Sequence, residues 1–356
     1  MKPRHVTLVL VAAFLGLASF APGTVRAGTQ QPSPMASGDE TARGILLYKQ
    51  GDIKAAINAL GAAVKKQKDD ADAWFYLGLA LNKNNNIGSA RKAFEAAIKI
   101  RPEFAPAHTA LGYTWVLANK LDKATREIDL ALALQPHDHE AHYLRAAVYL
   151  RQRLHAKALD ESNVAISIAP GYAEAFFLRT QALIGLYDEK VRWRSGWSRE
   201  EYREHRKGSS GSSALIKEAS DSLERYLNLK PDLPDKAVWQ DQLETMKFYA
   251  DAPENQFEPF PALADTQGRT RARITQKPEP AYTEEARSAG VSGTIVLKVV
   301  FSAEGKVEHI LVLQSLPYGL TEKAIAAARK IKFIPASKEG RPVSAFAQLE
   351  YTFTVY

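Results

Sequence analysis

A spacing of 34 residues governs the first half of the chain. Stepping by 34 from Gly44 leads to Gly78 and Gly112. The same step connects a series of alanines and a series of prolines: Ala56, Ala90, Ala124 and Ala158, and then Pro102, Pro136 and Pro170. A fixed period of this length indicates a repeat architecture, in which each unit buries its apolar face against the next.

The repeated glycines lie midway along a predicted first helix, where glycine costs about 1 kcal/mol relative to alanine. That cost is tolerable if the missing side chain lets a second helix approach closely. We interpret the alanine series as the facing positions of this second helix. Proline then ends each unit, because it lacks an N–H and disfavours helix in the preceding residue. The pattern predicts stacked helical hairpins.

The second unit resembles a tetratricopeptide repeat (TPR). It carries the signature residues of that family at Trp74, Leu77, Gly78, Leu81, Ala90, Phe94, Ala97 and Pro102. The third unit has His108 in the tryptophan position, and the first lacks the proline. The resemblance implies an all-α solenoid, which we expect over residues 39–250 with an insertion at about 188–213. A last amphipathic helix containing Trp239 and Leu243 is expected to cap it.

The period changes near the C-terminus. Apolar and polar residues alternate from Ile295 to Phe301 and again over residues 343–355, where Phe346 alone breaks the polar side. Alternation of this kind predicts strands. Between them we expect a second strand, after a turn at residues 303–306, and a helix that starts at Thr321 as its N-cap. A short helix over 283–289, stopped by Gly290, precedes the first strand.

This β-β-α-β order resembles the C-terminal domain of TonB, the energy transducer of Gram-negative envelopes. The resemblance covers residues 274–356. It rests on Gly293 at the start of the first strand and on four spaced motifs: Pro280-x-Tyr282, Gly305-Lys306-Val307, Phe333-x-Pro335-Ala336 and Gly340-x-Pro342-Val343. Thr283 departs from the proline that the family often has there. The expected fold class is therefore multidomain: an all-α TPR solenoid, a proline-containing linker at 251–273, and a small α+β TonB-like domain.

Residues 1–27 have the pattern of a secretory signal. Lys2 and Arg4 precede an apolar run over residues 6–20, and Val25 and Ala27 offer a cleavage site. The run is shorter than the ~20 residues that a membrane-spanning helix needs. We therefore expect a cleaved signal, a flexible leader at 28–38 and a periplasmic protein. Retention of the segment as an inner-membrane anchor is the alternative.

The sequence offers no catalytic constellation. Nothing places its serines, histidines and acids in a nucleophile-elbow or similar context, and it has no cysteine. We expect no enzyme activity and no cofactor. A group at one turn, His137, Asp138, His139 and His142, includes two histidines with metal-ligand spacing, but ordinary turn and cap residues explain it better. The net charge of +7 is modest and spread along the chain, so no nucleic-acid partner is expected.

Two surfaces are candidates for protein binding. The first is an aromatic face on the first helices of the repeats, made by Tyr48, Phe75, Tyr113, Tyr143 and Phe177. These rings either line a groove for a partner peptide or fill the packing between repeats, and the sequence leaves both open. The lysine and asparagine pattern of carboxylate-clamp TPR proteins is missing, which disfavours a C-terminal-carboxylate ligand.

The second candidate is the last strand, expected to lie at a sheet edge. Its residues Val343, Ala345, Gln348, Glu350, Thr352 and Thr354 could receive an extended peptide by β-augmentation. The resemblance to TonB implies the TonB-box segment of outer-membrane transporters as that partner. Self-pairing of the strand into a homodimer is the alternative.

These features favour a periplasmic adaptor with two protein-binding modules. The rival hypothesis is a TonB-type energy transducer anchored by an uncleaved N-terminus. In the TonB family the anchor carries a histidine inside the span. Here the nearby histidine, His5, lies in the basic flank, and the linker is much shorter than the long proline-rich spacer of TonB.

Overall fold

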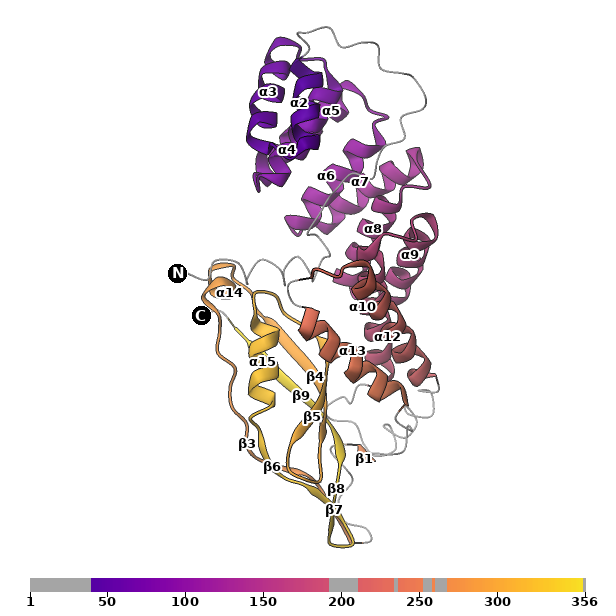
Figure 1. Cartoon of the computed structure of the whole chain (residues 1–356), viewed down its shortest axis with the longest axis vertical. Helices are drawn as coiled ribbons and strands as arrows, with labels where there is room; N and C mark the ends of the chain where they lie inside the picture. The colour runs from indigo at the N-terminus through magenta and orange to yellow at the C-terminus, as the bar shows by residue number, and fades with distance from the viewer. Residues whose placement is uncertain (1–39, 192–210, 234–235, 252–257, 260–267, 355–356) are drawn as a thin grey trace. The chain divides into compact units, whose positions relative to one another are not determined.

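The computed structural model describes residues 40–191, 211–233, 236–251, 258–259 and 268–354 (Figure 1). The expected signal and leader, and residues 192–210 of the expected insertion, lie outside this part of the chain. The described residues form two compact units, one ending at Pro170 and the other running from Gly171 toward the C-terminus.

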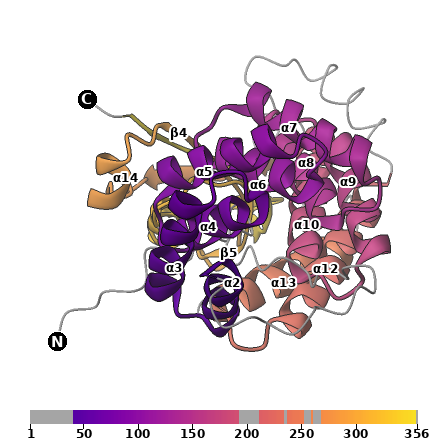
Figure 2. The same ribbon diagram turned by 90° about the horizontal axis from the view of Figure 1, so that it is seen from above.

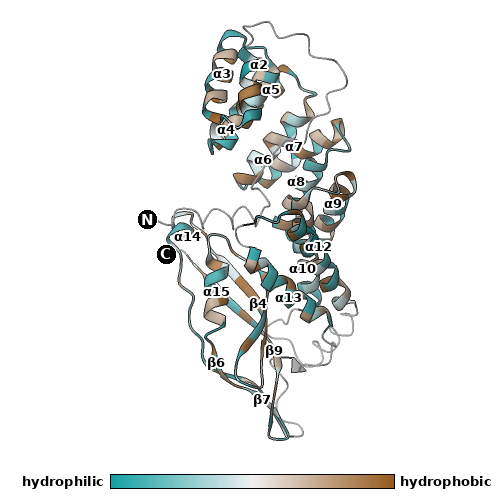
Figure 3. Ribbon diagram, viewed as in Figure 1, coloured by the Kyte–Doolittle hydropathy of each residue, from teal (hydrophilic) through white to brown (hydrophobic). Residues whose placement is uncertain are grey.

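The first unit consists of helical hairpins. In order they pair α2 (Glu40–Gln50) with α3 (Ile53–Lys66), α4 (Ala71–Lys83) with α5 (Ile87–Ile100), α6 (Ala105–Leu117) with α7 (Leu121–Leu134), and α8 (His139–Arg151) with α9 (His155–Ile168). Each of these helices carries both apolar and polar residues, as the mixed colouring of Figure 3 shows. All four members of the alanine series are fully buried. The helical repeat predicted from the 34-residue spacing is confirmed.

The glycine series allows the close approach that the spacing predicts. A Cβ atom at Gly44 would lie 2.5 Å from Leu60, and one at Gly78 would lie 2.5 Å from Phe94. The side chain facing each glycine is therefore the large residue at the centre of the second helix. The prediction that an alanine side chain faces each glycine was wrong, because the alanines lie one turn away along that helix. At Gly112 the backbone oxygen of Ala124 is also near, 3.6 Å from the Cβ position.

Helix N-caps connect successive repeats. Asp70 caps α4 by accepting a 2.9 Å bond from the N–H of Ala73, and its other oxygen accepts a 2.8 Å bond from Thr41 of the preceding repeat. Asp138 accepts from Thr109 in the same way, at 2.7 Å. One carboxylate thus satisfies a free backbone donor and also bonds the neighbouring hairpin.

The second unit begins with α10 (Ala173–Val191), α12 (Ser212–Leu229) and α13 (Lys236–Asp251), which lie side by side in Figures 1 and 2. Arg179 of α10 bonds Glu218 of α12 at 2.8 Å. Trp239 of α13 packs edge-on against Phe177, with ring centroids 4.9 Å apart. Helices α10 and α12 thus form a further hairpin, and α13 packs against it.

The rest of the second unit is built on a four-stranded sheet in the order β1 (Glu258–Pro259), β9 (Ala345–Phe353), β4 (Gly293–Phe301) and β5 (Val307–Gln314). Strand β9 pairs antiparallel with β4 along its whole length. The buried cluster beneath the sheet joins residues of α14 (Glu284–Ser288) and α15 (Leu320–Ala328) to the inward side chains of β4 and β9. The expected α+β class is confirmed.

Short strands complete this domain. Strand β3 (Arg273–Gln276) pairs with β6 (Lys332–Ile334), while β7 (Ala336–Lys338) pairs with both β2 (Arg269–Thr270) and β8 (Arg341–Val343). Two pieces of the expected linker, β1 and β2, are therefore paired with strands of the C-terminal domain. A strand of two residues is too short for alternation to reveal it in the sequence.

Three local expectations are settled by the structure. Gly290, at φ +64°, follows the end of α14 as predicted, and Thr283 lies just before the helix as its N-cap. Thr321 does not cap α15, because Gly319 holds the N-cap and the Thr321 hydroxyl bonds the backbone of Leu316. The predicted strand over 343–355 is interrupted at Ser344, whose hydroxyl accepts a bond from the N–H of Ala303.

Candidate functional site

The four-stranded sheet has two edges at which a further strand could pair. Strand β9 is paired by β1 only at Ala345 and Phe346, so from Ala347 to Phe353 the described residues leave this side without a neighbouring strand. Strand β5 lies at the opposite side. Backbone N–H and C=O groups on such edges are templates for an added strand.

The register shows which β9 groups face the open side. The N–H of Val312 and the C=O of Ile310 both bond the side chain of Gln242, which lies outside the sheet. The backbone N–H and C=O of Leu311, between them, therefore point to β4. Leu311 is paired with Lys298 of β4, so the backbone N–H and C=O of Lys298 point to β5. Because these directions alternate along a strand, the backbone groups of Leu297 point to β9. The pair Leu297–Leu349 is therefore hydrogen-bonded. It follows that Gln348, Glu350 and Thr352 present their groups to the open edge.

A lysine already touches this edge. The Nζ of Lys277 donates a 2.7 Å hydrogen bond to the backbone oxygen of Glu350, consistent with an outward carbonyl there. The same ammonium lies 4.5 Å from the centre of the Tyr351 ring. Because this bond is exposed to solvent, an incoming backbone donor could replace it at little cost.

The sequence-predicted edge residues divide accordingly. Ala345, Gln348, Glu350 and Thr352 lie on β9. Val343 does not, since it belongs to β8 and pairs with Ala336, and Thr354 follows the end of β9. The break at Ser344 separates Val343 from the edge.

The β5 edge is closed by α13. The side-chain amide of Gln242 donates 2.9 Å to the oxygen of Ile310 and accepts 3.2 Å from the N–H of Val312. One residue of a parallel strand bonds its neighbour with this same i, i+2 pattern. The hydroxyl of Tyr249 donates to the oxygen of His309 at 3.0 Å. Burial raises the pKa of Tyr249 well above its usual value, so the hydroxyl keeps its proton.

The outer face of the sheet carries a lysine surrounded by rings. The Nζ of Lys298 lies 4.8 Å from the ring centre of Tyr187 and 5.0 Å from those of Tyr249 and Phe346. It also bonds the Tyr187 hydroxyl at 2.6 Å. Cation–π attraction of this kind is strongest where water is excluded. The cluster connects strands β4 and β9 to helices α10 and α13.

The five aromatic residues predicted on the first helices are all buried. The largest exposed fraction among Tyr48, Phe75, Tyr113, Tyr143 and Phe177 is 7%. Phe75, for example, packs against Phe104 with centroids 4.9 Å apart. A ring enclosed to this extent cannot offer its face to a partner, so the burial favours packing between repeats and gives no support to an aromatic groove made by these side chains.

Histidine replaces tryptophan without losing its hydrogen bond. Trp74 donates from Nε1 to the oxygen of Lys68 at 3.0 Å, and 34 residues later Nε2 of His108 lies 2.9 Å from the oxygen of Pro102. Nδ1 of His108 lies 2.7 Å from Glu127. The Glu127 bond is the main reason that the pKa of His108 is raised.

The next repeat copies this arrangement with His142, Pro136 and Glu161. Glu127 and Glu161 are themselves 34 residues apart, a signal that the sequence interpretation missed. His142 and the N-cap Asp138 are thereby committed to protein partners. Among the described residues, no three His, Cys, Asp or Glu side chains are placed to hold a metal ion together.

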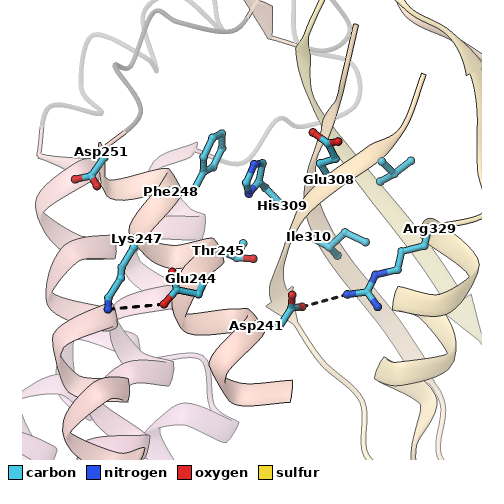
Figure 4. A pocket seen from close by; sticks show the side chains of 11 residues that line it. Asp241, Glu244, Thr245, Lys247, Phe248, Asp251, Glu308, His309, Ile310 and Arg329 are labelled. Carbon is cyan, nitrogen blue, oxygen red and sulfur yellow. Dashed lines mark hydrogen bonds and ion pairs between the residues drawn. The ribbon is translucent and has the colours of Figure 1, made fainter. Parts of the chain in front are cut away.

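A cavity of about 600 Å³ lies between α13 and β5. Figure 4 shows its side chains, with the ring of His309 beside that of Phe248 and Arg329 pointing to Asp241. The two rings stack 3.5 Å apart, and the ion pair spans 3.2 Å. Both acidic and basic side chains line the cavity, so it favours no ligand of one charge.

Comparison with known families covers both units. Residues 278–355 match the model of the Gram-negative bacterial TonB protein C-terminal. Residues 41–106 and 81–148 each match a tetratricopeptide repeat model. The chain carries tetratricopeptide repeats and a TonB C-terminal domain. The two resemblances inferred from sequence motifs are confirmed, and the open β9 edge belongs to the TonB C-terminal domain.

Several solved structures are similar to the TPR part. The crystal structure of MamA protein is 20% identical, with 54% of this chain and 96% of that chain covered and a TM-score of 0.40. YrrB, described as a TPR protein with an unusual peptide-binding site, is 18% identical, with coverage of 56% and 88% and a TM-score of 0.38. TTC0263, a TPR protein of Thermus thermophilus, is 16% identical, with 60% and 100% covered and a TM-score of 0.44. No curated protein matches the chain.

TPR and TonB C-terminal domains are interaction modules, so the domain content of the chain is that of a protein-interaction adaptor. In the part of the chain that the structure describes, no helix is long and apolar enough to cross a membrane.

Proposed function

We propose that the chain is a non-enzymatic adaptor of the Gram-negative envelope whose TonB domain accepts an extended peptide along β9. The observation that carries the proposal is that no strand of the described residues pairs with the outer edge of β9 from Ala347 to Phe353. Gln348, Glu350 and Thr352 would supply the backbone donors and acceptors. The signal-like residues 1–27 support a periplasmic location, and the likeness to TonB favours an outer-membrane transporter as the source of the peptide.

The TPR unit would hold a second protein. Because the rings on its first helices are buried, we assign this role to the solenoid surface as a whole and to no particular side chain.

A proline scan tests the β9 site. The protein is the chain from residue 28 onward, which retains every described residue. The probe is a synthetic peptide with the TonB-box sequence of an outer-membrane transporter. Proline at Gln348, Glu350 or Thr352 removes an outward N–H and spares the ladder to β4. At least one of these variants should bind the peptide about tenfold more weakly or worse, while alanine at the same position changes affinity less than about threefold.

Leu349→Pro is the matched control, because its N–H points to β4 and its loss should unfold the domain. Circular dichroism and thermal melting separate the two classes. If all folded proline variants bind like the parent, or if the parent does not bind extended peptides at all, the β9 site is wrong.

A further inference from the structure

At the contact between α13 and β5, a helix side chain makes the hydrogen bonds to the strand edge that the backbone of a neighbouring strand would otherwise make. Gln242 is only 4% exposed, and both polar atoms of its amide bond β5 at residues 310 and 312. A helix surface offers no free backbone groups to a strand edge. Its side chains therefore have to satisfy the edge, and Gln242 and Tyr249 together bond backbone groups of three β5 residues, His309, Ile310 and Val312.

Strand β5 is the edge that most needs such a cover. Residues 310–313 read Ile-Leu-Val-Leu without a charge, and Ile310 and Leu311 are buried. Glu308 and His309 precede this segment on β5. An apolar segment on an edge strand is a template for pairing with another chain. In β5 the one acidic residue, Glu308, lies near the start of the strand. In β9 the charges of Glu350 and of the Lys277 ammonium lie within the stretch that could accept a strand.

Strand β5 also contains an irregularity, a β-bulge, at a place that α13 covers. His309 has a φ of +47°, and the β4–β5 register shifts between Lys298 and Val300. This bulge lies where the Tyr249 hydroxyl reaches the backbone and where Phe248 stacks on the His309 ring. Bulges and covering elements are both devices by which sheets avoid edge-to-edge association.

We propose that α13 is a built-in cover of the β5 edge, and that a chain with α13 displaced pairs through β5 with a second copy of itself. The partner is another β5 because its segment 310–313 is apolar in every copy and loses its cover with α13, so two identical edges can join about a two-fold axis. The cover limits strand addition in the folded chain to β9. The inference does not depend on any ligand at β9.

The test is a pair of conservative changes, Gln242→Leu with Tyr249→Phe, in the chain from residue 28 onward. These changes remove three hydrogen bonds and nearly keep the volume of both side chains. Hydrogen exchange at the Val312 amide should become at least about tenfold faster, since it loses its acceptor. Sedimentation velocity should then show a rise in mass with concentration toward twice that of the monomer.

Two further variants decide the interpretation. Gln240→Leu makes the same change on an exposed position of α13 and should leave the protein monomeric. Val312→Pro, added to the double variant, removes the outward N–H of β5 and should restore the monomer if pairing runs through that edge. Unchanged exchange at Val312 would show that the two side chains do not close the edge. Faster exchange without association would overturn the self-pairing.

Discussion

Phe346 of β9 stacks on Tyr249 of α13, with ring centroids 5.4 Å apart and planes inclined by 29°. Phe346 is the one apolar residue on the otherwise polar side of the last strand, and this contact accounts for it. Both rings also flank the ammonium of Lys298 at 5.0 Å. Strand β9 therefore serves two purposes. Its outer face at Phe346 holds α13, and from Ala347 onward no strand in the described part of the chain pairs with its outer edge.

Replacing Phe346 by threonine, which restores polar alternation, should weaken the docking of α13. The loss of an aromatic pair and of one face of the Lys298 cluster should lower the free energy of unfolding by about 1–3 kcal/mol. Hydrogen exchange should accelerate near Tyr249. Glu350→Thr on the same side of β9 is the control, because Glu350 is exposed. Equal stability of the two variants would argue against the stacking contact.

At the glycines of the repeat series, replacement by alanine should destabilise the protein, although alanine normally favours a helix more than glycine does. Gly78→Ala would place a Cβ 2.5 Å from the Phe94 ring, so we expect a loss of about 1–3 kcal/mol from overpacking. Gly61 is also inside a helix, but its Cβ would meet nothing within 4 Å. Gly61→Ala should therefore stabilise by about 0.5–1 kcal/mol. Chemical denaturation measures both, and shifts of the same sign would contradict the helix contact.

His108 should make the stability of the TPR unit depend on pH. Its ring nitrogens both face acceptors, the oxygen of Pro102 and a carboxylate oxygen of Glu127, and only the imidazolium donates from both. Its folded pKa is raised. The added stability is therefore fully present below the unfolded pKa of about 6.5 and is lost as pH rises through the folded pKa.

His108→Trp gives the comparison, since Trp74 makes the equivalent backbone bond in the preceding repeat. Stability relative to this variant should fall as pH rises from about 6 to about 9, measured by urea denaturation at each pH. A difference that stays constant over this range would show that His108 is not charged in the folded protein.

Lys277→Met should strengthen peptide binding at β9. The change removes the ammonium from the Glu350 oxygen and frees that acceptor for a peptide N–H. We expect affinity for the TonB-box peptide to rise about two- to tenfold, since an exposed hydrogen bond no longer has to be exchanged. Lys338→Met, on the separate β7, serves as the control for lost charge. Weaker binding by Lys277→Met alone would mean that Lys277 contacts the peptide.

Sequence alone determined the modules and much of their internal order. The 34-residue spacing placed glycine and alanine where two helices meet, because hairpin packing repeats the same contact in every unit. Alternation placed β4, β5 and β9, because a sheet with one buried face imposes a period of two. Thr283 and Gly290 followed local capping rules, whereas Thr321 did not, because its hydroxyl bonds the backbone of Leu316.

Tertiary structure decided which surfaces remain free. The aromatic positions of the first helices were recognised from sequence, but their burial depends on how each hairpin stacks on the next. Phe346 was visible as an exception, yet its partner Tyr249 lies 97 positions earlier, beyond any local pattern. Gln242 carried no signal at all, since an amide on an amphipathic helix looks the same whether it faces water or bonds a strand. Periodicity records which face of an element is buried, and only the assembled fold determines what buries it.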